Sequence, residues 1–276
     1  MSLRKRWEGV IRDWLRPDRA EFLLARKALA AGFVERAAFG ECLSDSERLE
    51  LLTRLIREVP KDFQDDFVQE VGYSRSQLMQ DLFVLTEVGL RRRQGFFVEF
   101  GASDGISLSN TWLLEKRMGW KGILAEPARC WHESLTRNRT CAIDTDCVWS
   151  RSGEQLDFDE VSVGEFSTLS RFSKSDGHAE ARVDKTSYQV PTVSLNDLLR
   201  RHGAPAEPDY LSIDTEGSEF SILKELDFAR FNFKVITCEH NYTPMREQIR
   251  QLLEQAGYRR KHVELSRFDD WYVRAK

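Results

Sequence analysis

The run Phe96-Phe97-Val98-Glu99-Phe100-Gly101-Ala102-Ser103-Asp104-Gly105 decides the fold of this 276-residue chain. Valine and aromatic residues favour a buried strand, which stops at two closely spaced glycines. Glycine permits positive φ angles and lets a ligand approach the backbone closely. Helical periodicity follows over residues 107–118. A strand, a glycine turn and a helix in this order are typical of the start of a nucleotide-type α/β site.

Beyond residue 95 the pattern alternates between strand and helix with short connections, which predicts a mainly parallel, doubly wound α/β sheet. The last two strands are joined by a turn around residues 267–269 and form an antiparallel hairpin at the C-terminus. A further hairpin excursion is expected at residues 153–161. The seven strands expected in the sheet are residues 96–100, 122–127, 146–150, 209–214, 233–238, 258–265 and 270–274.

Residues 1–75 are predicted to form an N-terminal helical region, and residues 76–276 the α/β domain. Apolar residues recur at helical spacing over residues 3–15, which begin with three basic residues. Two interpretations are open for this helix. It rests on an anionic membrane surface, or it packs on its own domain or on a partner subunit of a homo-oligomer. Farther on, Ser44 or Asp45 is expected to cap a helix that contains Leu51 and Leu55.

The composition excludes several classes of function. The chain has 41 basic and 45 acidic residues, and the resulting net charge of −4 argues against a nucleic-acid partner. Five cysteines without a CxxC pair predict reduced thiols and a cytoplasmic protein. No apolar run approaches the roughly 20 residues of a transmembrane helix, and no secretory signal is expected.

The glycine turn differs from the dinucleotide fingerprint GxGxxG. That fingerprint needs its middle glycine because a pyrophosphate approaches the backbone there, whereas this chain has Ser103. Glu99 and Asp104 add negative charge, which repels a pyrophosphate but suits a cationic ligand. S-Adenosylmethionine is a ligand of this kind, with a sulfonium, an ammonium and no phosphate.

Glu126 ends the second predicted strand, 25 residues after Gly101. A carboxylate in this position can accept two hydrogen bonds from a ribose diol. NAD offers the same diol, so Glu126 does not distinguish adenosyl cofactors. The alternative is that Glu126 only caps the helix after Pro127.

Acidic residues also follow the fourth and fifth strands of the predicted order. Asp214, Glu216, Glu239 and His240 all end apolar runs and are expected to converge on one edge of the sheet. A hydroxyl becomes a good nucleophile when a base removes its proton, and His240 or Asp214 suits that role. Alternatively, Asp214, Glu239 and His240 hold a divalent metal such as magnesium or manganese. Strand-end acids often cap the next helix, a role that Glu219 fits.

Three segments together resemble the FkbM family of S-adenosylmethionine-dependent methyltransferases. They are Val98-Glu-Phe-Gly-Ala-Ser-Asp-Gly-Ile-Ser-Leu-Ser-Asn-Thr111, Gly119-Trp-Lys-Gly-Ile-Leu-Ala-Glu-Pro127, and Asp209-Tyr-Leu-Ser-Ile-Asp-Thr-Glu-Gly-Ser-Glu219 with Glu239-His-Asn241. The resemblance covers residues 76–274. It implies a class I, Rossmann-like methyltransferase fold, and O-methylation of a hydroxyl on a sugar, polysaccharide or secondary metabolite. By position it implies that Glu126 holds the ribose and that Asn110 contacts the cofactor. The residues implied to line its methionine end are Glu99, Gly101, Ala102, Asp104 and Gly105.

Two other functions compete with methyl transfer. An NAD-linked oxidoreductase lacks support because the chain has no GxGxxG fingerprint. A non-catalytic adenosyl-binding or assembly module is disfavoured by the intact Asp214, Glu239 and His240 set. The acceptor, a small molecule or a glycan, is expected to be selected by residues 162–189. This loop either covers the ligand as a lid or is a passive surface excursion.

Overall fold

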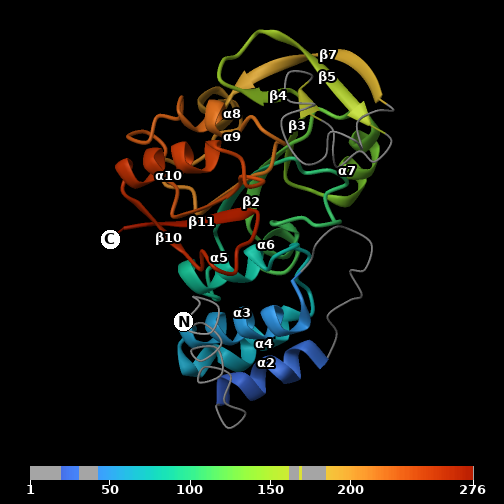
Figure 1. Cartoon of the computed structure of the whole chain (residues 1–276). Helices are drawn as coiled ribbons and strands as arrows, with labels where there is room; N and C mark the ends of the chain where they lie inside the picture. The colour runs from blue at the N-terminus through green and yellow to red at the C-terminus, as the bar shows by residue number, and fades with distance from the viewer. Residues whose placement is uncertain (1–19, 31–42, 162–167, 170–184, 276) are drawn as a thin grey trace. The chain divides into compact units, whose positions relative to one another are not determined.

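The computed structural model describes residues 20–30, 43–161, 168–169 and 185–275. The chain forms two compact units, Met1–Leu90 and Arg91–Lys276 (Figure 1). The sequence-based boundary between residues 75 and 76 describes where the α/β domain is expected to begin, which is a different quantity from these compact units. It stays a prediction. The amphipathic helix predicted over residues 3–15 lies outside the described residues.

The first unit is helical where it is described. Its elements are α2 (Ala20–Ala30), α3 (Asp45–Glu58), the short 3-10 helix η1 (Lys61–Phe63), α4 (Gln64–Val71) and α5 (Gln80–Val88). Ser44 caps α3 in a reciprocal capping box, in which the Ser44 backbone N–H donates to Glu47 Oε2 at 2.9 Å. One side of α3, which includes Leu51 and Leu55, is fully buried. The predicted helix and its cap at Ser44 are therefore confirmed.

The second unit is built on a seven-stranded sheet with the order β10-β11-β9-β8-β1-β2-β3. All pairs from β9 to β3 are parallel, and β11 runs antiparallel to both β9 and β10. The predicted α/β sheet with its C-terminal antiparallel hairpin is thus present. The strands are β1 (Phe96–Phe100), β2 (Lys121–Ala125), β3 (Ala142–Asp144), β8 (Tyr210–Ile213), β9 (Val235–Glu239), β10 (Tyr258–Lys261) and β11 (Asp269–Arg274).

Alternation along β1 separates the two faces of this sheet. Val98 and Phe100 belong to a core shared with α8 (Leu195–Arg201), α9 (Glu219–Leu223) and α10 (Met245–Gln255). Because successive side chains of a strand point to opposite faces, Phe97 and Glu99 point to the other face. Both are buried. Glu99 is therefore a carboxylate within the packed interior and needs polar partners there.

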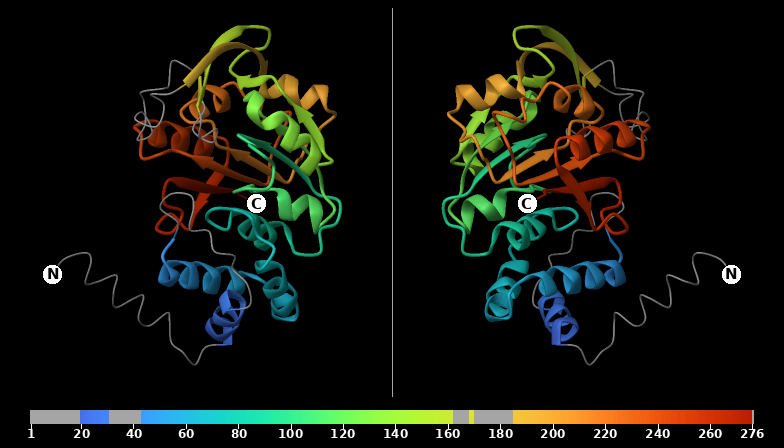
Figure 2. Two further views of the ribbon diagram at one scale, coloured as in Figure 1. Left: turned by 90° about the vertical axis from the view of Figure 1, so that its right-hand side faces the viewer. Right: turned by 90° about the vertical axis from the view of Figure 1, so that its left-hand side faces the viewer.

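A second sheet differs from the prediction. Residues 147–149, expected in the third strand of the main sheet, form β4 (Cys147–Trp149) and pair with β7 (Lys185–Ser194). The edge of the main sheet is instead β3, which lies five residues earlier in the chain. β7 also pairs with β5 (Gln155–Val161), which in turn pairs with β6 (Thr168–Leu169). Figures 1 and 2 show β5 and β7 side by side, away from β10 and β11. Because residues 155–161 form a single strand whose partner β7 lies far along the chain, the predicted hairpin excursion at residues 153–161 was wrong.

The helix predicted over residues 107–118 is also shorter than expected. Only α6 (Trp112–Lys116) is helical, and the preceding residues from Gly101 form turns. Leu108 has a φ of 56°, which no α-helix contains. The Asp104 carboxylate accepts a hydrogen bond from the backbone N–H of Ser107, and the Glu99 carboxylate accepts one from the backbone N–H of Asn110. These hydrogen bonds replace those that an α-helix would form.

In the part of the chain that the structure describes, no helix is long and apolar enough to cross a membrane. The four cysteines of the same part, Cys130, Cys141, Cys147 and Cys238, are free thiols. Cys42 lies outside it.

Candidate active site

The carboxyl ends of four neighbouring strands bring the predicted site residues together. From β1 the chain continues outward to β2 and β3 and later returns to β8 on the other side of β1. Strand order therefore reverses between β1 and β8, and ligands of open α/β sheets bind at such a point. Gly101 follows β1, Glu126 follows β2, Asp214 follows β8, and Glu239 ends β9.

Gly101 brings the turn directly against the backbone of the next strand. Its φ is 75°, and a Cβ on it would lie 2.0 Å from the carbonyl oxygen of Asp214. The Gly101 N–H donates to Ala125 O at 3.2 Å, which ties the start of the turn to β2. The adjacent Ala102 is buried. A glycine is therefore required at position 101 for two reasons: the backbone of Asp214 leaves no room for a Cβ, and the φ angle is positive.

Asp104 and Gly105 are engaged with protein groups. The Asp104 Oδ1 atom accepts the backbone N–H groups of Ile106 at 2.8 Å and Ser107 at 2.7 Å, so this carboxylate stabilises the turn itself. Gly105 has a φ of 78°, and a Cβ there would lie 2.6 Å from the Cγ of Arg139. The sequence-based interpretation placed a ligand against this glycine, whereas the close neighbour in the structure is an arginine.

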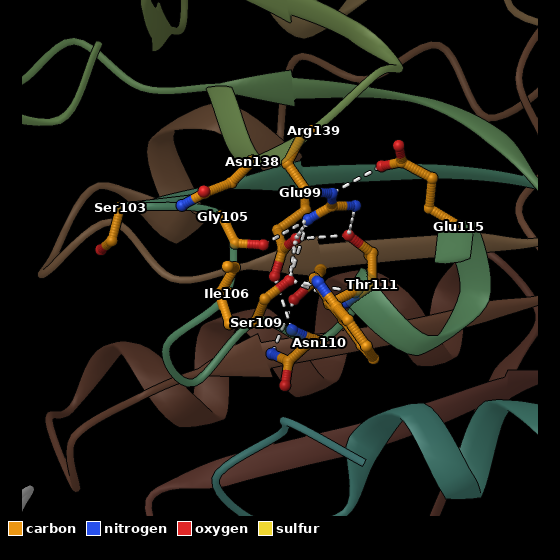
Figure 3. A network of polar contacts seen from close by, with 12 residues as sticks. Glu99, Ser103, Gly105, Ile106, Ser109, Asn110, Thr111, Glu115, Asn138 and Arg139 are labelled. Atoms are coloured by element: carbon orange, nitrogen blue, oxygen red, sulfur yellow. Dashed lines mark hydrogen bonds and ion pairs between the residues drawn. The ribbon is translucent and has the colours of Figure 1, made fainter. Parts of the chain in front are cut away.

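Glu99 accepts hydrogen bonds from the segment that follows the turn (Figure 3). Its donors are the hydroxyl of Ser109 at 3.0 Å, the N–H of Asn110 at 2.7 Å and the hydroxyl of Thr111. Burial raises the pKa of Glu99, and the attraction of Arg139 opposes that shift. The Glu99 carboxylate accepts hydrogen bonds from protein groups. Any effect of Glu99 on the methionine end of a cofactor would therefore come from holding the residues after the turn in place.

Asn110 combines a structural contact with a free acceptor. Its Nδ2 donates to the hydroxyl of Ser212 on β8 at 2.9 Å. Its Oδ1 is buried and has no hydrogen-bond partner among the described residues. A buried acceptor without a donor costs free energy, and a ligand that carries an N–H or O–H group can relieve that cost.

Glu126 is oriented by two backbone donors. Its oxygens accept from the N–H groups of Ser103 at 2.8 Å and Ala128 at 2.9 Å. Burial is the main reason that the pKa of Glu126 rises to about 7, and the charges of Asp214 and Glu160 add to the shift. Each oxygen keeps a second lone pair, so the oriented carboxylate can still accept hydrogen bonds from a diol.

Three carboxylates meet beside the turn. Asp214, Glu216 and Glu239 offer oxygens that all lie within 4.8 Å of one another. Burial raises the pKa of Glu239 well above its usual range, and the charges of Asp214 and Glu216 raise it further. A hydrogen bond between the Glu239 and Asp214 side chains contributes to the same shift. Such a cluster attracts a cation.

His240 is not part of that cluster. Its Nδ1 accepts the Tyr242 N–H at 3.0 Å, and its Nε2 lies 3.8 Å from Asp270 Oδ1. Burial lowers the pKa of His240 to about 4, so the ring is neutral at pH 7. The predicted trio of Asp214, Glu239 and His240 therefore has to be corrected. The structure places Glu216 with the two carboxylates and turns the imidazole toward Asp270.

Glu219 is the first residue of α9, and its side chain holds the loop before the helix rather than capping the helix as was weighed for it. Its Oε1 accepts from the backbone N–H groups of Thr215 at 3.1 Å and Gly217 at 3.0 Å. These bonds hold the loop that carries Glu216, whose φ of 57° is in the left-handed region. Most of the predicted lid, residues 162–167 and 170–184, lies outside the described residues.

Arg139 is the main residue of this site that sequence reasoning missed. Its side chain is fully buried, whereas that of Arg137, two positions earlier, is 70% exposed. Both arginines belong to one polar run at the end of a predicted helix, and no local pattern distinguishes them. Only the meeting of this helix end with the glycine turn buries Arg139.

Comparison with known proteins identifies the family of this chain. A family model described as the methyltransferase FkbM domain matches residues 99–260. The crystal structure of methyltransferase FkbM from Methylobacillus flagellatus is similar over 92% of this chain, with 14% sequence identity and a TM-score of 0.46. The similarity covers 58% of that chain, so the present chain spans little more than half of its length. A comparison with curated proteins finds no match.

Proposed function

This chain belongs to the FkbM family of methyltransferases, and on that premise we propose that it uses S-adenosylmethionine to methylate a hydroxyl oxygen. The acceptor class that we propose is a sugar, polysaccharide or secondary metabolite. The observation that carries the donor assignment is the convergence of Asp214, Glu216 and Glu239 with Glu126 at the switch point of the sheet. A negative site next to a turn without the phosphate-binding glycine pattern fits a cationic adenosyl compound.

The residues present fit such a donor. Glu126 would accept hydrogen bonds from the ribose hydroxyls, because two backbone N–H groups already orient its oxygens. The unpartnered Oδ1 of Asn110 would accept from an ammonium group. When bound, S-adenosylmethionine supplies a methyl group on positively charged sulfur. Calorimetric titration with S-adenosylhomocysteine tests this half of the proposal, and absence of binding at micromolar concentrations would refute it.

For the base we assign Asp214, with Glu239 as its coupled partner. Asp214 would accept the proton that the acceptor hydroxyl loses as its oxygen forms the new bond to carbon. The Asp214–Glu239 pair can hold this proton because two neighbouring carboxylates do not both ionise readily. His240 is less suited to this role, since its neutral ring is buried against Asp270.

The donor affinity is expected to depend on pH through Glu126. Its pKa of about 7 means that the carboxylate is ionised only above neutral pH in the unliganded protein. A ribose diol favours the ionised form, so affinity for S-adenosylhomocysteine should rise from pH 6 to pH 8. Glu126→Gln should bind more weakly and lose most of this dependence. Calorimetry across that range measures both, and an equally steep profile in the variant would contradict the assignment.

The raised pKa of Glu126 has the opposite effect on the folding stability of the unliganded protein, which should fall as pH rises. A folded-state pKa of about 7 lies above the ordinary 4.5, so the protonated form is favoured by folding. The associated stability is present below pH 4.5 and is lost as pH rises through 7. Denaturant unfolding of the wild type and Glu126→Gln at pH 5 and pH 8 should therefore differ in their pH dependence.

A divalent metal is the second reading of the carboxylate cluster, with Asp214, Glu216 and Glu239 as its oxygen donors. We expect turnover to persist in a chelator, because the raised pKa of Glu239 favours its neutral form and so reduces the charge of the cluster. The measurement is initial rate in EDTA, followed by addition of magnesium or manganese. A loss of turnover that either metal restores would assign the cluster to a metal instead.

The acceptor is best identified directly. Incubation of the protein with labelled S-adenosylmethionine and fractions of native cell extract, followed by mass spectrometry of the labelled product, would reveal its class. A product methylated on nitrogen or carbon would refute O-methylation but leave the donor assignment intact. The cytoplasmic location and the membrane or subunit contact of residues 3–15 stay predictions.

A further inference from the structure

Arg139 contacts residues of the stretch from β1 to α6, all of which lie at least 24 positions earlier in the sequence. It follows directly after α7 (His132–Asn138), and its guanidinium is buried beneath the glycine turn (Figure 3). Its Nη1 donates to the carbonyl oxygen of Gly105 and to the hydroxyl of Ser109, each at 3.1 Å. Its Nη2 donates to the Thr111 hydroxyl at 2.9 Å. The guanidinium thus contacts the middle and the end of the irregular segment between β1 and α6.

Two buried carboxylates balance the charge of Arg139. Its Nε donates to Glu115 Oε2 at 2.5 Å, and its Nη1 lies 3.8 Å from Glu99 Oε2. Burial opposes ionisation of Glu115, but Arg139 and Thr140 outweigh it and hold the pKa of Glu115 at about 2. The planar guanidinium can serve several acceptors in fixed directions, which a lysine ammonium cannot do.

The adjacent residue Asn138 extends the same contact. Its Nδ2 donates to the carbonyl oxygen of Asp104 at 2.8 Å, so consecutive residues of the helix end hold consecutive carbonyls of the turn. Gly105 has no Cβ, and this allows its backbone to lie on the aliphatic part of Arg139. The carbonyl groups of Asp104 and Gly105 are therefore held in place by side chains from the end of α7.

The turn needs such external support because its own conformation is unfavourable. Ser103 and Leu108 are non-glycine residues with φ values of 47° and 56°. Conformations of this kind cost about 1–3 kcal/mol each and persist only where the surroundings enforce them. In the segment between β1 and α6, the enforcing groups are Glu99 from the strand and Arg139 from the helix end.

We propose that Arg139 is a positioning residue that holds the Gly101–Gly105 turn in its donor-binding conformation. The inference rests on the proposed function, since it assigns the turn to the methyl donor. Arg139 itself makes no contact with the donor in this account. Its contribution should therefore appear in donor affinity and in the KM for the donor, with kcat at saturating donor much less affected.

The decisive variant is Arg139→Lys in the full chain, which keeps the positive charge but loses the planar guanidinium and its several directed N–H donors. We expect it to weaken S-adenosylhomocysteine binding about tenfold or more, because small misplacements of a binding group are costly. The matched control is Arg92→Lys. Arg92 pairs with the buried Asp209 at 2.6 Å, and Asp209 accepts the N–H of Phe96 at the opposite end of β1. This control should leave donor affinity within about twofold of the wild type.

Amide hydrogen exchange gives a readout that needs no donor. Peptides covering residues 101–107 should exchange faster in Arg139→Lys than in the wild type or Arg92→Lys. If the wild type fails to bind S-adenosylhomocysteine but this difference appears, the proposed function fails and the positioning role stands. If exchange of the turn and donor affinity are both unchanged in folded Arg139→Lys, the inference is overturned.

A milder variant decides the matter if Arg139→Lys does not fold. Thr111→Val removes one acceptor of the guanidinium and one donor of Glu99 while both charges remain in place. We expect faster exchange of residues 101–107 and a several-fold weaker donor affinity, with less effect on kcat. Wild-type values for exchange and affinity in a folded Thr111→Val protein would contradict the proposal.

Discussion

Replacing Gly101 with alanine is expected to destabilise the second unit by about 3 kcal/mol or more and to abolish donor binding. The new Cβ would lie 2.0 Å from the carbonyl oxygen of Asp214. That atom belongs to the backbone after β8, so no side-chain rotation relieves the overlap, and the carboxyl ends of β1 and β8 have to separate. The φ of 75° adds the strain of an L-residue in the left-handed region. Denaturant unfolding and calorimetry with S-adenosylhomocysteine measure the two effects.

Gly119→Ala is the matched control for this prediction. Gly119 has a similar φ of 69°, but an added Cβ would have no heavy atom of the described residues within 4 Å. It should therefore show only the conformational cost, about 1 kcal/mol. Equal destabilisation by the two substitutions would mean that the contact with Asp214 is unimportant. Wild-type donor affinity in a folded Gly101→Ala protein would remove this turn from the donor site.

Asp214→Asn is expected to lower kcat by about 100-fold or more, the usual contribution of a general base. Asparagine keeps the size of the side chain but cannot accept the proton of the acceptor hydroxyl. Residual activity is expected from Glu239, because removal of the neighbouring charge lowers the pKa of that carboxyl and leaves more of it ionised and able to accept a proton. Steady-state kinetics with the identified acceptor provide the measurement, and Asp214→Asn combined with Glu239→Gln should be slower than either single variant.

Two comparisons make the Asp214 result specific. Asp157→Asn, at an exposed position on β5, should have wild-type kinetics. His240→Asn should reduce kcat far less than Asp214→Asn, since the His240 ring faces Asp270 and lies outside the carboxylate cluster. Full activity in Asp214→Asn would refute the base assignment while leaving the donor site intact. A larger loss in His240→Asn than in Asp214→Asn would return the base to His240.

Local sequence patterns determined the framework of this site. The apolar run ending at Gly101 predicts β1 and its turn, and strand ends at Glu126, Asp214 and Glu239 place carboxylates at one edge of a parallel sheet. Such features are readable because strand periodicity and glycine conformations are properties of neighbouring residues. The motifs around these positions also identify the family, which the match over residues 99–260 confirms.

The tertiary structure decided which polar side chains meet. Arg139 and Arg137 look equivalent in the sequence, and only packing against the glycine turn buries the first of them. Glu216 joins Asp214 and Glu239, while His240 turns away toward Asp270. These outcomes depend on contacts between segments 23 or more residues apart, where the direction of each side chain follows from the packing of whole elements. Sequence periodicity places a residue at a strand or helix end, but it does not specify the partner that its side chain finds there.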